Sequence, residues 1–317
     1  METITLGSSG IEVSRLCIGA WQAAGWSSSD DDRFVEVVQH AMDRGLNFID
    51  TAEGYGGGRS EELVARALGP RRDHMVVATK VGPSHAAPDD LGQALDASLQ
   101  RLQTDHVNLY QYHWPSPDVP LAETLGAMEE QRRAGKIRAI GVSNWLAPEW
   151  DEFDDPARID ALQPCHSLLW RSAETAAIPT CRAHNIAVIP YSPLCQGALA
   201  GRFRSMDDVP DQRDPRRKNK VWRQEKLPGV LAVIDKLEEI GQKYDKTMAQ
   251  TALRWLLDQP GVTAPIVGAS RVAQVDDNLG ALNWHLDADD WAALDEISRP
   301  LSADLTPQDT LWGWHPK

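Results

Sequence analysis

Eight short apolar runs recur along this chain of 317 residues, and they constrain its fold more than any other feature. Most segments between them carry apolar residues at helical spacing, as in Leu91, Leu95, Leu99 and Leu102. A strand followed by a helix, repeated eight times, predicts a parallel sheet that closes into a barrel. The predicted strands are 15–18, 47–49, 75–78, 107–112, 139–142, 160–162, 187–190 and 263–267.

Acidic residues and a glycine mark the limits of the predicted helices. Asp30 to Asp32 precede the first helical run, and Gly45 follows it. Asp89 and Asp90 precede the third helical run in the same way. We therefore expect side-chain caps at these helix starts.

Three segments fall outside the basic repeat. The patterns at 230–244 and 289–297 predict two extra helices. The opening residues 3–13, with Gly7 inside them, predict a short hairpin that plugs the bottom of the barrel. The expected class is thus α/β, a (β/α)8 TIM barrel with an N-terminal hairpin and two extra helices.

Composition and charge limit the organisation and the partners of the chain. No Gly/Ser-rich or Pro-rich spacer is present, so we expect 1–317 to form one domain, with 300–317 as its tail. The 46 Asp and Glu residues outnumber the 32 Lys and Arg residues, and the net charge of −14 argues against nucleic acid or an anionic membrane as partner.

The same features predict a cytoplasmic location. METITLGSSG lacks the pattern of a signal peptide, and no apolar run approaches the roughly 18 residues that span a bilayer. Cys17, Cys165, Cys181 and Cys195 show no pairing pattern, so reduced thiols are expected.

Four residues follow predicted strands in the first third of the chain: Asp50, Tyr55, Lys80 and His113. In a barrel of parallel strands these positions converge on one face, where such folds keep their chemistry. Tyr55 lies in DTAEGYGGG, where small residues allow a sharp turn over the barrel mouth. The four side chains therefore predict one site.

The residue types suit proton transfer. A tyrosine with an ordinary pKa near ~10 needs a nearby cation that stabilises its phenolate, and Lys80 would be that cation. Asp50 would balance the charge of Lys80, and His113 would orient a substrate oxygen or relay a proton.

Other readings remain open at this point. Any one of these residues alone fits a structural ion pair or a cap better than catalysis, but four together favour proton donation. No Ser or Cys with a base near it suggests a nucleophile. The nine histidines show no metal-binding spacing, so no metal is expected.

At the level of the whole chain the sequence resembles the aldo-keto reductase family, in the branch that includes ion-channel β subunits and bacterial sugar and aldehyde reductases. The resemblance implies a (β/α)8 barrel, a nicotinamide cofactor bound without GxGxxG, and hydride transfer to a carbonyl with Tyr55 as general acid. The matching segments, in order, are DTAEGYGGGRSEELVARAL, ATKVG, YQYHWPSP, GKIRAIGVSNW, LQP, VIPYSPLCQGALAGR and IVGASRVAQVDDN.

The resemblance also implies the residues that hold the cofactor. Ser143, Asn144 and Gln163 would hold the carboxamide, and Tyr191 would stack on the nicotinamide ring. The loop along the pyrophosphate and the group around the adenosine would comprise Ser192, Leu194, Gln196, Gly268, Ser270, Arg271, Gln274, Asp277 and Asn278.

Cofactor preference depends on Arg271. Beside Ser270 at a helix start, Arg271 suits a 2′-phosphate, which favours NADP(H) over NAD(H). The alternative is that Ser270 caps the helix and Arg271 is solvated. The segment after Gln163 departs from the family pattern, because many relatives of this subgroup have tyrosine in place of His166. His166 would contact substrate or serve the structure, and Cys165 beside it would pack.

Tryptophans suggest a pocket with aromatic walls. Those expected on the catalytic face would bind a sugar or an aromatic aldehyde, although loop packing explains each one equally well. The proposed pocket set comprises Trp21, which would also touch the cofactor, Trp26, Trp114, Trp145 and His166, with Trp170 and Trp222 on the same face.

The C-terminal tail and a basic cluster complete the predictions. The tail, with Trp312 and Trp314, should dock on the pocket mouth or on another subunit of a homo-oligomer. The basic cluster at 213–223 either clamps the anionic dinucleotide or is a solvated loop.

The sequence therefore predicts an NADPH-dependent reductase of small aldehydes, ketones or sugars. A sugar or polyol dehydrogenase working in the oxidative direction is the alternative within this class. Outside it, the rivals are a Schiff-base aldolase that uses Lys80 and a non-catalytic nucleotide-binding regulatory subunit.

Overall fold

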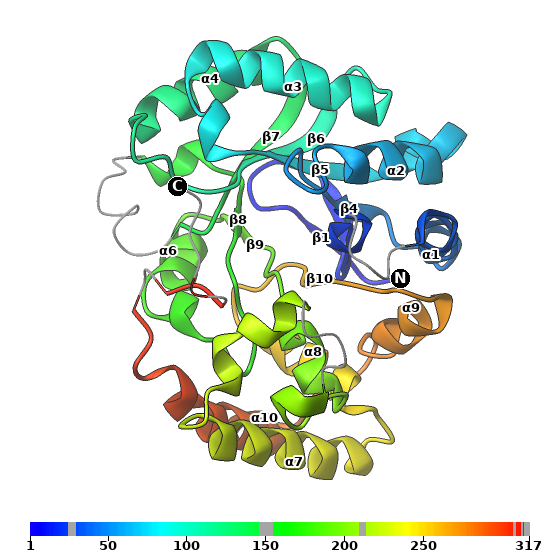
Figure 1. Cartoon of the computed structure of the whole chain (residues 1–317), viewed down its shortest axis with the longest axis vertical. Helices are drawn as coiled ribbons and strands as arrows, with labels where there is room; N and C mark the ends of the chain where they lie inside the picture. Colours follow the sequence, from blue (N-terminus) through cyan, green and yellow to red (C-terminus); the bar gives the residue numbers. More distant parts are fainter. Residues whose placement is uncertain (25–29, 146–154, 209–213, 307–308, 312, 314–317) are drawn as a thin grey trace.

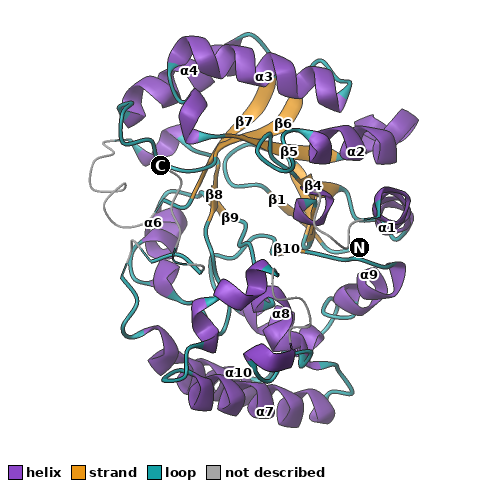
Figure 2. Ribbon diagram, in the orientation of Figure 1, coloured by secondary structure: helices purple, strands orange, loops and turns teal. Residues whose placement is uncertain are grey.

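Eight parallel strands form the centre of the computed structural model, which describes residues 1–24, 30–145, 155–208, 214–306, 309–311 and 313. Their order is β10-β3-β4-β5-β6-β7-β8-β9. Helices surround them on the outside (Figures 1 and 2). The strands are β3 (Cys17–Gly19), β4 (Phe48–Asp50), β5 (Val76–Val81), β6 (Val107–Tyr112), β7 (Ile137–Ser143), β8 (Ala161–Gln163), β9 (Ala187–Val188) and β10 (Ile266–Val267).

The two ends of this strand order meet. Thr263 N–H donates to the Val188 carbonyl and Ile266 N–H donates to the Pro190 carbonyl, both at 2.8 Å. The segment of β10 therefore bonds to the segment of β9. All eight predicted strands are present, and the predicted barrel class is confirmed.

An antiparallel hairpin covers the end of the barrel where the strands begin. It consists of β1 (Thr3–Thr5) and β2 (Glu12–Ser14). Leu6 and Val13 are fully buried and join the cluster of small and branched side chains inside the barrel. Gly7 lies so close to the backbone of Asp160, before β8, that a Cβ would come within 2.2 Å of that carbonyl oxygen. The predicted hairpin thus packs at the bottom of the barrel.

Seven helices of the described chain lie around the barrel, and two lie outside this repeat. The extra helices, α7 (Leu227–Lys243) and α10 (Ala288–Ser298), pack side by side in Figure 1 and agree with the prediction. The others are α1 (Asp31–Asp43), α2 (Arg59–Leu68), α3 (Pro88–Leu102), α4 (Leu121–Arg133), α6 (Ala177–Ala183), α8 (Met248–Asp258) and α9 (Val272–Leu279).

Local sequence explains where several helices begin. Asp30 caps α1, because its carboxylate accepts from the backbone N–H groups of Asp32 and Arg33. The predicted cap of α3 is wrong: Asp89 and Asp90 lie inside its first turn, and Pro88 begins the helix without a side-chain cap. Proline is well suited to this first position, and the two carboxylates still favour the positive end of the helix dipole.

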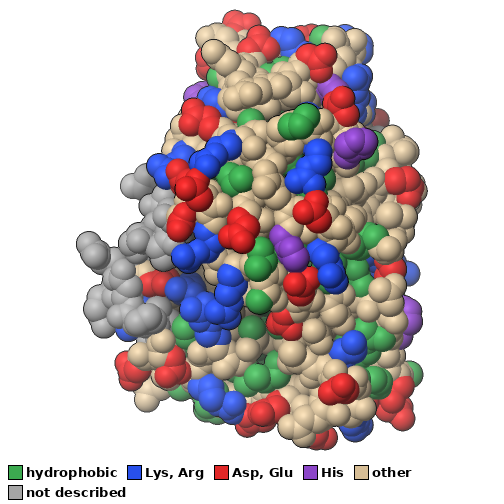
Figure 3. Space-filling view, turned by 90° about the vertical axis from the view of Figure 1, so that its right-hand side faces the viewer, with side chains coloured by type: hydrophobic (Ala, Val, Ile, Leu, Met, Phe, Trp, Pro, Cys, Tyr) green, Lys and Arg blue, Asp and Glu red, His purple; other side chains and the backbone are tan. Residues whose placement is uncertain are grey.

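Charges of both signs are interspersed on the face that Figure 3 shows, with a group of Lys and Arg near its left edge. Ion pairs join neighbouring helices, as between Arg59 of α2 and Asp31 of α1 at 2.5 Å. Within the described residues, every helix is too short or too polar to cross a membrane.

Candidate active site

Adjacent strand ends bring the four predicted residues together. Asp50 ends β4, Lys80 is the penultimate residue of β5 and His113 directly follows β6. The strands run parallel, so their carboxyl ends share one rim of the barrel. Tyr55 lies in the turn after β4, where its N–H donates to the Ala52 carbonyl at 3.1 Å.

The Lys80 ammonium is the centre of the group. It donates to the Asp50 Oδ1 at 2.6 Å, to the Thr51 carbonyl at 2.8 Å and to the Tyr55 hydroxyl at 3.1 Å. Lys80 has no exposed surface. An ammonium has three N–H donors, so these contacts satisfy a buried charge completely.

The surroundings set the protonation of this pair. Burial alone would lower the pKa of Lys80, but Asp50 and Tyr55 outweigh it and raise the pKa, so Lys80 is charged. Burial raises the pKa of Tyr55 above its ordinary value, and Lys80 only partly opposes this shift. The net direction for Tyr55 is opposite to the one expected from sequence, because burial is the larger effect.

His113 lies with its ring edge against Tyr55, at 5.7 Å between ring centroids and an angle of 76°. Burial and the charge of Lys80 hold the pKa of His113 well below its ordinary value. A neutral imidazole has one N–H donor, and no described residue occupies its ring nitrogens. The half-buried Tyr55 hydroxyl and this imidazole are thus the groups that an incoming oxygen atom would meet.

Gln111 is a part of the site that the sequence analysis missed. Its amide N–H and that of Gln163 both donate to Asp50 Oδ2 at 2.9 Å. The two amides also bond to each other at 3.0 Å. Because side chains alternate along a strand, Gln111 points to the same side as His113 two residues later, and this signal in YQYHW could have identified it.

The predicted carboxamide residues form one polar network beside the four. Asn144 Nδ2 donates to the His113 carbonyl at 2.9 Å and to Ser143 Oγ at 3.1 Å. The Tyr191 hydroxyl donates to Asn144 Oδ1 at 2.8 Å. Within the described chain, Oε1 of Gln163 receives no donor, so it fits the amide N–H of a carboxamide. Hydrogen-bond donors and a free acceptor therefore lie together beside His113.

The loop after β9 also fits an anionic group. Gln196 lies in the 3-10 helix η6 (Cys195–Ala200) with a φ of 57°, and its Nε2 is buried without a hydrogen-bond partner among the described residues. An unpaired buried donor is costly unless a ligand accepts from it. Ser192 and Leu194 lie half-buried in the same loop.

The group predicted around the adenosine divides in two. Gly268, Ser270 and Arg271 are exposed. Ser270 does not cap α9: its own N–H and hydroxyl donate to Gln274 Oε1 at 2.7 and 3.0 Å.

The remaining two residues of that group have structural partners. Asp277 Oδ1 accepts from Thr247 at 3.0 Å and from Gln250 at 2.9 Å, at the start of α8. Asn278 is buried and its amide lies 3.5 Å from the Gly268 carbonyl. Asp277 therefore ties α9 to α8, which the sequence did not indicate.

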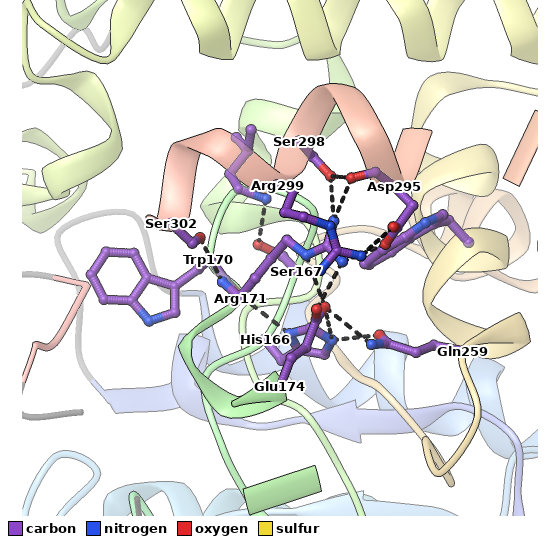
Figure 4. A network of polar contacts seen from close by, with 12 residues as sticks. His166, Ser167, Trp170, Arg171, Glu174, Gln259, Asp295, Ser298, Arg299 and Ser302 are labelled. Carbon is purple, nitrogen blue, oxygen red and sulfur yellow. Dashed lines mark hydrogen bonds and ion pairs between the residues drawn. The ribbon is translucent and has the colours of Figure 1, made fainter. Parts of the chain in front are cut away.

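The contacts of His166 favour the structural one of its two expected roles over a place in the substrate pocket. It is fully buried, with Nδ1 at 3.2 Å from the Trp170 carbonyl and Nε2 at 2.5 Å from Gln259 Oε1. Figure 4 shows this ring inside a network with Arg171 and Glu174. Burial also lowers its pKa.

The predicted tryptophans differ in exposure. Trp21 and Trp114 are half-buried, and Trp114 lies 6.4 Å from the His113 ring, measured between centroids. Trp145 has no exposed surface and belongs to the main core, so it offers no surface to a substrate. Trp170 and Trp222 are also buried. Trp26, Trp312 and Trp314 lie outside the described residues.

Partners already occupy part of the basic cluster. Asp214 pairs with Arg216, and Asp309 pairs with Lys220 at 2.5 Å. Lys218 and Arg223 are exposed. Fewer charges than the sequence suggested are therefore available to a dinucleotide.

Comparisons with known proteins identify the family of this chain. Residues 15–299 match the model of the aldo/keto reductase family. An NADH-specific methylglyoxal reductase of Escherichia coli is 34% identical over 330 residues, covering 95% of this chain and 99% of that protein. The structure of a glycerol dehydrogenase from Gluconobacter oxydans has a TM-score of 0.86 and 31% identity, over 97% of this chain and 98% of the other.

A second solved structure is that of an aldo/keto reductase from Klebsiella pneumoniae in complex with NADP and acetate. It has a TM-score of 0.76 and 30% identity, over 94% of this chain and 96% of the other. The family match covers most of the chain, and all three relatives align over nearly their full length. This chain therefore belongs to the aldo/keto reductase family and is an oxidoreductase.

Proposed function

We propose that this protein reduces the carbonyl group of a small aldehyde, ketone or sugar with NADPH, and that Tyr55 donates the proton. The observation that carries the proposal is the hydrogen bond from Lys80 to the Tyr55 hydroxyl, at 3.1 Å, beside the unoccupied imidazole of neutral His113. His113 and Tyr55 can thus hold a carbonyl oxygen and protonate it at the same position.

The roles follow from the charges. Bound nicotinamide would supply the hydride to the carbonyl carbon. The His113 N–H donates a hydrogen bond to the carbonyl oxygen and fixes its direction. As negative charge develops on that oxygen, the Tyr55 hydroxyl gives up its proton, and the Lys80 ammonium stabilises the phenolate that remains. Asp50 keeps Lys80 charged and in place.

The cofactor residues support the proposal through their chemistry. Ser143, Asn144 and Gln163 present donors and an acceptor next to His113, and the unpaired amide of Gln196 suits a pyrophosphate. Exposed Arg271 at the start of α9 favours a 2′-phosphate and hence NADPH. The name of the Escherichia coli relative specifies NADH, so both nucleotides belong in the test.

A polyol dehydrogenase is the second candidate, and the glycerol dehydrogenase among the similar structures favours it. The same residues serve the reverse reaction, with phenolate Tyr55 as the base. The aldolase alternative has no support, because all three N–H groups of Lys80 have acceptors and its pKa is raised. A charged ammonium is no nucleophile.

The test compares wild type with Tyr55→Phe and with Tyr110→Phe. Tyr110 lies on β6 with a buried hydroxyl that has no partner among the described residues, so it is a matched control. We expect Tyr55→Phe to bind NADPH as wild type does, by fluorescence titration, and to lose about 10²–10⁴-fold in kcat on a carbonyl panel. Tyr110→Phe should retain both. A wild type that binds neither NADPH nor NADH would refute the proposal.

A further inference from the structure

The C-terminal residues Asp304, Asp309 and Leu311 contact the last part of the basic cluster and the residues that follow it. Lys220 N–H donates to the Leu311 carbonyl at 2.8 Å, and the Lys220 ammonium pairs with Asp309 at 2.5 Å. Lys226 pairs with Asp304 at 2.6 Å. Three contacts thus join Asp304, Asp309 and Leu311 to residues 220–226.

Asp309 is well prepared for its pair with Lys220. Its Oδ2 accepts from the N–H and the hydroxyl of Thr306, both at 2.9 Å, which leaves Oδ1 for the ammonium. The side chains of Lys220 and Asp309 are 15% and 24% exposed, so the pair is partly shielded from solvent. Burial would raise the pKa of Asp309, but Lys220 and Thr306 lower it to about 2. Asp309 is therefore charged throughout the neutral range.

An apolar contact secures the same segment. Leu311 has no exposed surface and belongs to the core cluster that contains Val221 and Trp222. These two residues lie in the 3-10 helix η9 (Lys220–Trp222). The chain end therefore fixes η9 by an ion pair, a backbone bond and a buried leucine.

From η9 the contacts lead to the loop after β9. Asn219 caps η9, since its Oδ1 accepts from Val221 N–H at 3.1 Å. The Nδ2 of Asn219 points the other way, 3.4 Å from Gln196 Oε1 and 3.6 Å from Cys195 Sγ. Gln196 is the residue whose other amide atom is buried and unpaired. Lys220 and its neighbour Asn219 therefore connect Asp309 to Gln196 in the loop after β9.

We propose that Lys220 and Asp309 are positioning residues that slow the release of the nucleotide, because their ion pair holds Asn219 against Gln196. This inference rests on the proposed nucleotide site. Asn219 lies beside Gln196, so the nucleotide leaves most easily when residues 219–222 move away from that loop. The movement must break the pair with Asp309 and the bond to Leu311.

The experiment measures the dissociation rate constant of NADPH by stopped-flow fluorescence in full-length Lys220→Gln and Asp309→Asn. Both changes remove one charge and preserve side-chain shape. The matched control is Lys236→Gln, which breaks an ion pair with Glu239 at 2.6 Å on the outer surface of α7. We expect the dissociation rate constant of NADPH to increase about fivefold or more in each of the two variants and to stay unchanged in the control.

Two further measurements separate positioning from general damage. The charge exchange Lys220→Asp with Asp309→Lys should restore slow release, and the thermal midpoints of the variants should not correlate with their release rates. A kcat that rises together with release would show that release limits turnover.

Each outcome decides the matter. Equal dissociation rate constants in wild type and in both variants would overturn the role of the Lys220–Asp309 pair. The proposed function would stand in that case, because wild type would still bind NADPH. Equal acceleration in Lys236→Gln would also overturn the role of the pair, because the effect would then be general. Absence of NADPH and NADH binding in wild type would instead refute the proposed function itself.

Discussion

Single residues at this site owe their charge to their neighbours. Lys80 is buried but charged because Asp50 lies 2.6 Å away, whereas His113 is neutral because burial and Lys80 act in the same direction. Tyr55 keeps its proton because burial dominates. The site therefore combines one cation with two neutral groups that can donate hydrogen bonds.

A pH profile follows from these directions. Reduction needs protonated Tyr55, and its pKa is raised, so kcat/KM for reduction should stay constant until about pH 10 and fall only above it. Oxidation of an alcohol needs the phenolate, so kcat/KM for oxidation should rise as the pH approaches and passes about 10. The lowered pKa of His113 means that reduction should show no inflection as pH falls through about 6.5. An inflection there that His113→Gln removes would contradict this assignment.

The Lys80–Asp50 pair should also matter for folding. Lys80→Met leaves the Asp50 carboxylate buried without its cation, and we expect the free energy of unfolding in urea to fall by about 3–5 kcal/mol. Adding Asp50→Asn should recover part of this loss. The control Lys136→Met breaks an exposed pair with Asp96 at 2.5 Å and should cost about 0–1 kcal/mol. Equal losses for the two lysines would show that Asp50 is not isolated from solvent.

Among the elements, the agreement between predicted and observed strands varies. The run 107–112 coincides with β6, whereas the run predicted at 187–190 gives a strand of only two residues, Ala187–Val188. Pro190 has no N–H to donate, so the regular ladder stops before it. The loop that replaces it carries Tyr191 and the residues expected along the pyrophosphate.

The hairpin offers a test of how an element is seated. Gly7 and Gly10 both have positive φ, but a Cβ at Gly7 would meet the Asp160 carbonyl at 2.2 Å, and one at Gly10 would meet open space. Gly10→Ala should therefore cost only the roughly 1–2 kcal/mol of the left-handed backbone. Gly7→Ala should lower the free energy of unfolding by about 1–3 kcal/mol more, because the hairpin must move off the barrel. Similar losses in urea unfolding would show that the hairpin is loosely seated.

For the molecule as a whole, Arg171 connects the end of the chain to the barrel. Its guanidinium pairs with Glu174 at 2.7 Å and donates to the Asp295 carbonyl at 2.7 Å and to Ser298 Oγ at 2.8 Å, while its backbone N–H donates to Ser302 at 2.9 Å (Figure 4). Helix α10 is thereby fixed to the loop after β8.

Arg171→Met should lower the free energy of unfolding by about 3–5 kcal/mol and speed amide exchange in α10, because it leaves Glu174 and Asp295 without their shared cation. Arg299 also pairs with Asp295 but is 64% exposed, so Arg299→Gln should cost about 0–1 kcal/mol. Faster amide exchange in α10 for Arg299→Gln than for Arg171→Met would show that Arg299, and not Arg171, mainly holds α10 in place.

The sequence by itself determined the class of fold and which four residues meet. Period and run length give parallel strands and outer helices, and parallel strands place Asp50, Lys80 and His113 at one rim whatever the details of packing. The family resemblance added the residues that are expected to hold the cofactor, because motifs and their order can be read from the sequence.

Only the tertiary structure decided which polar residues are used by the site and which by the framework. His166, Trp145 and Asp277 have residue types that suit a pocket, yet contacts with segments far along the chain bury them or bind their polar atoms. Gln111 became part of the site for the same reason, because its partners Asp50 and Gln163 come from other strands. Burial and distant partners depend on three-dimensional neighbours, and a local pattern of residues does not contain them.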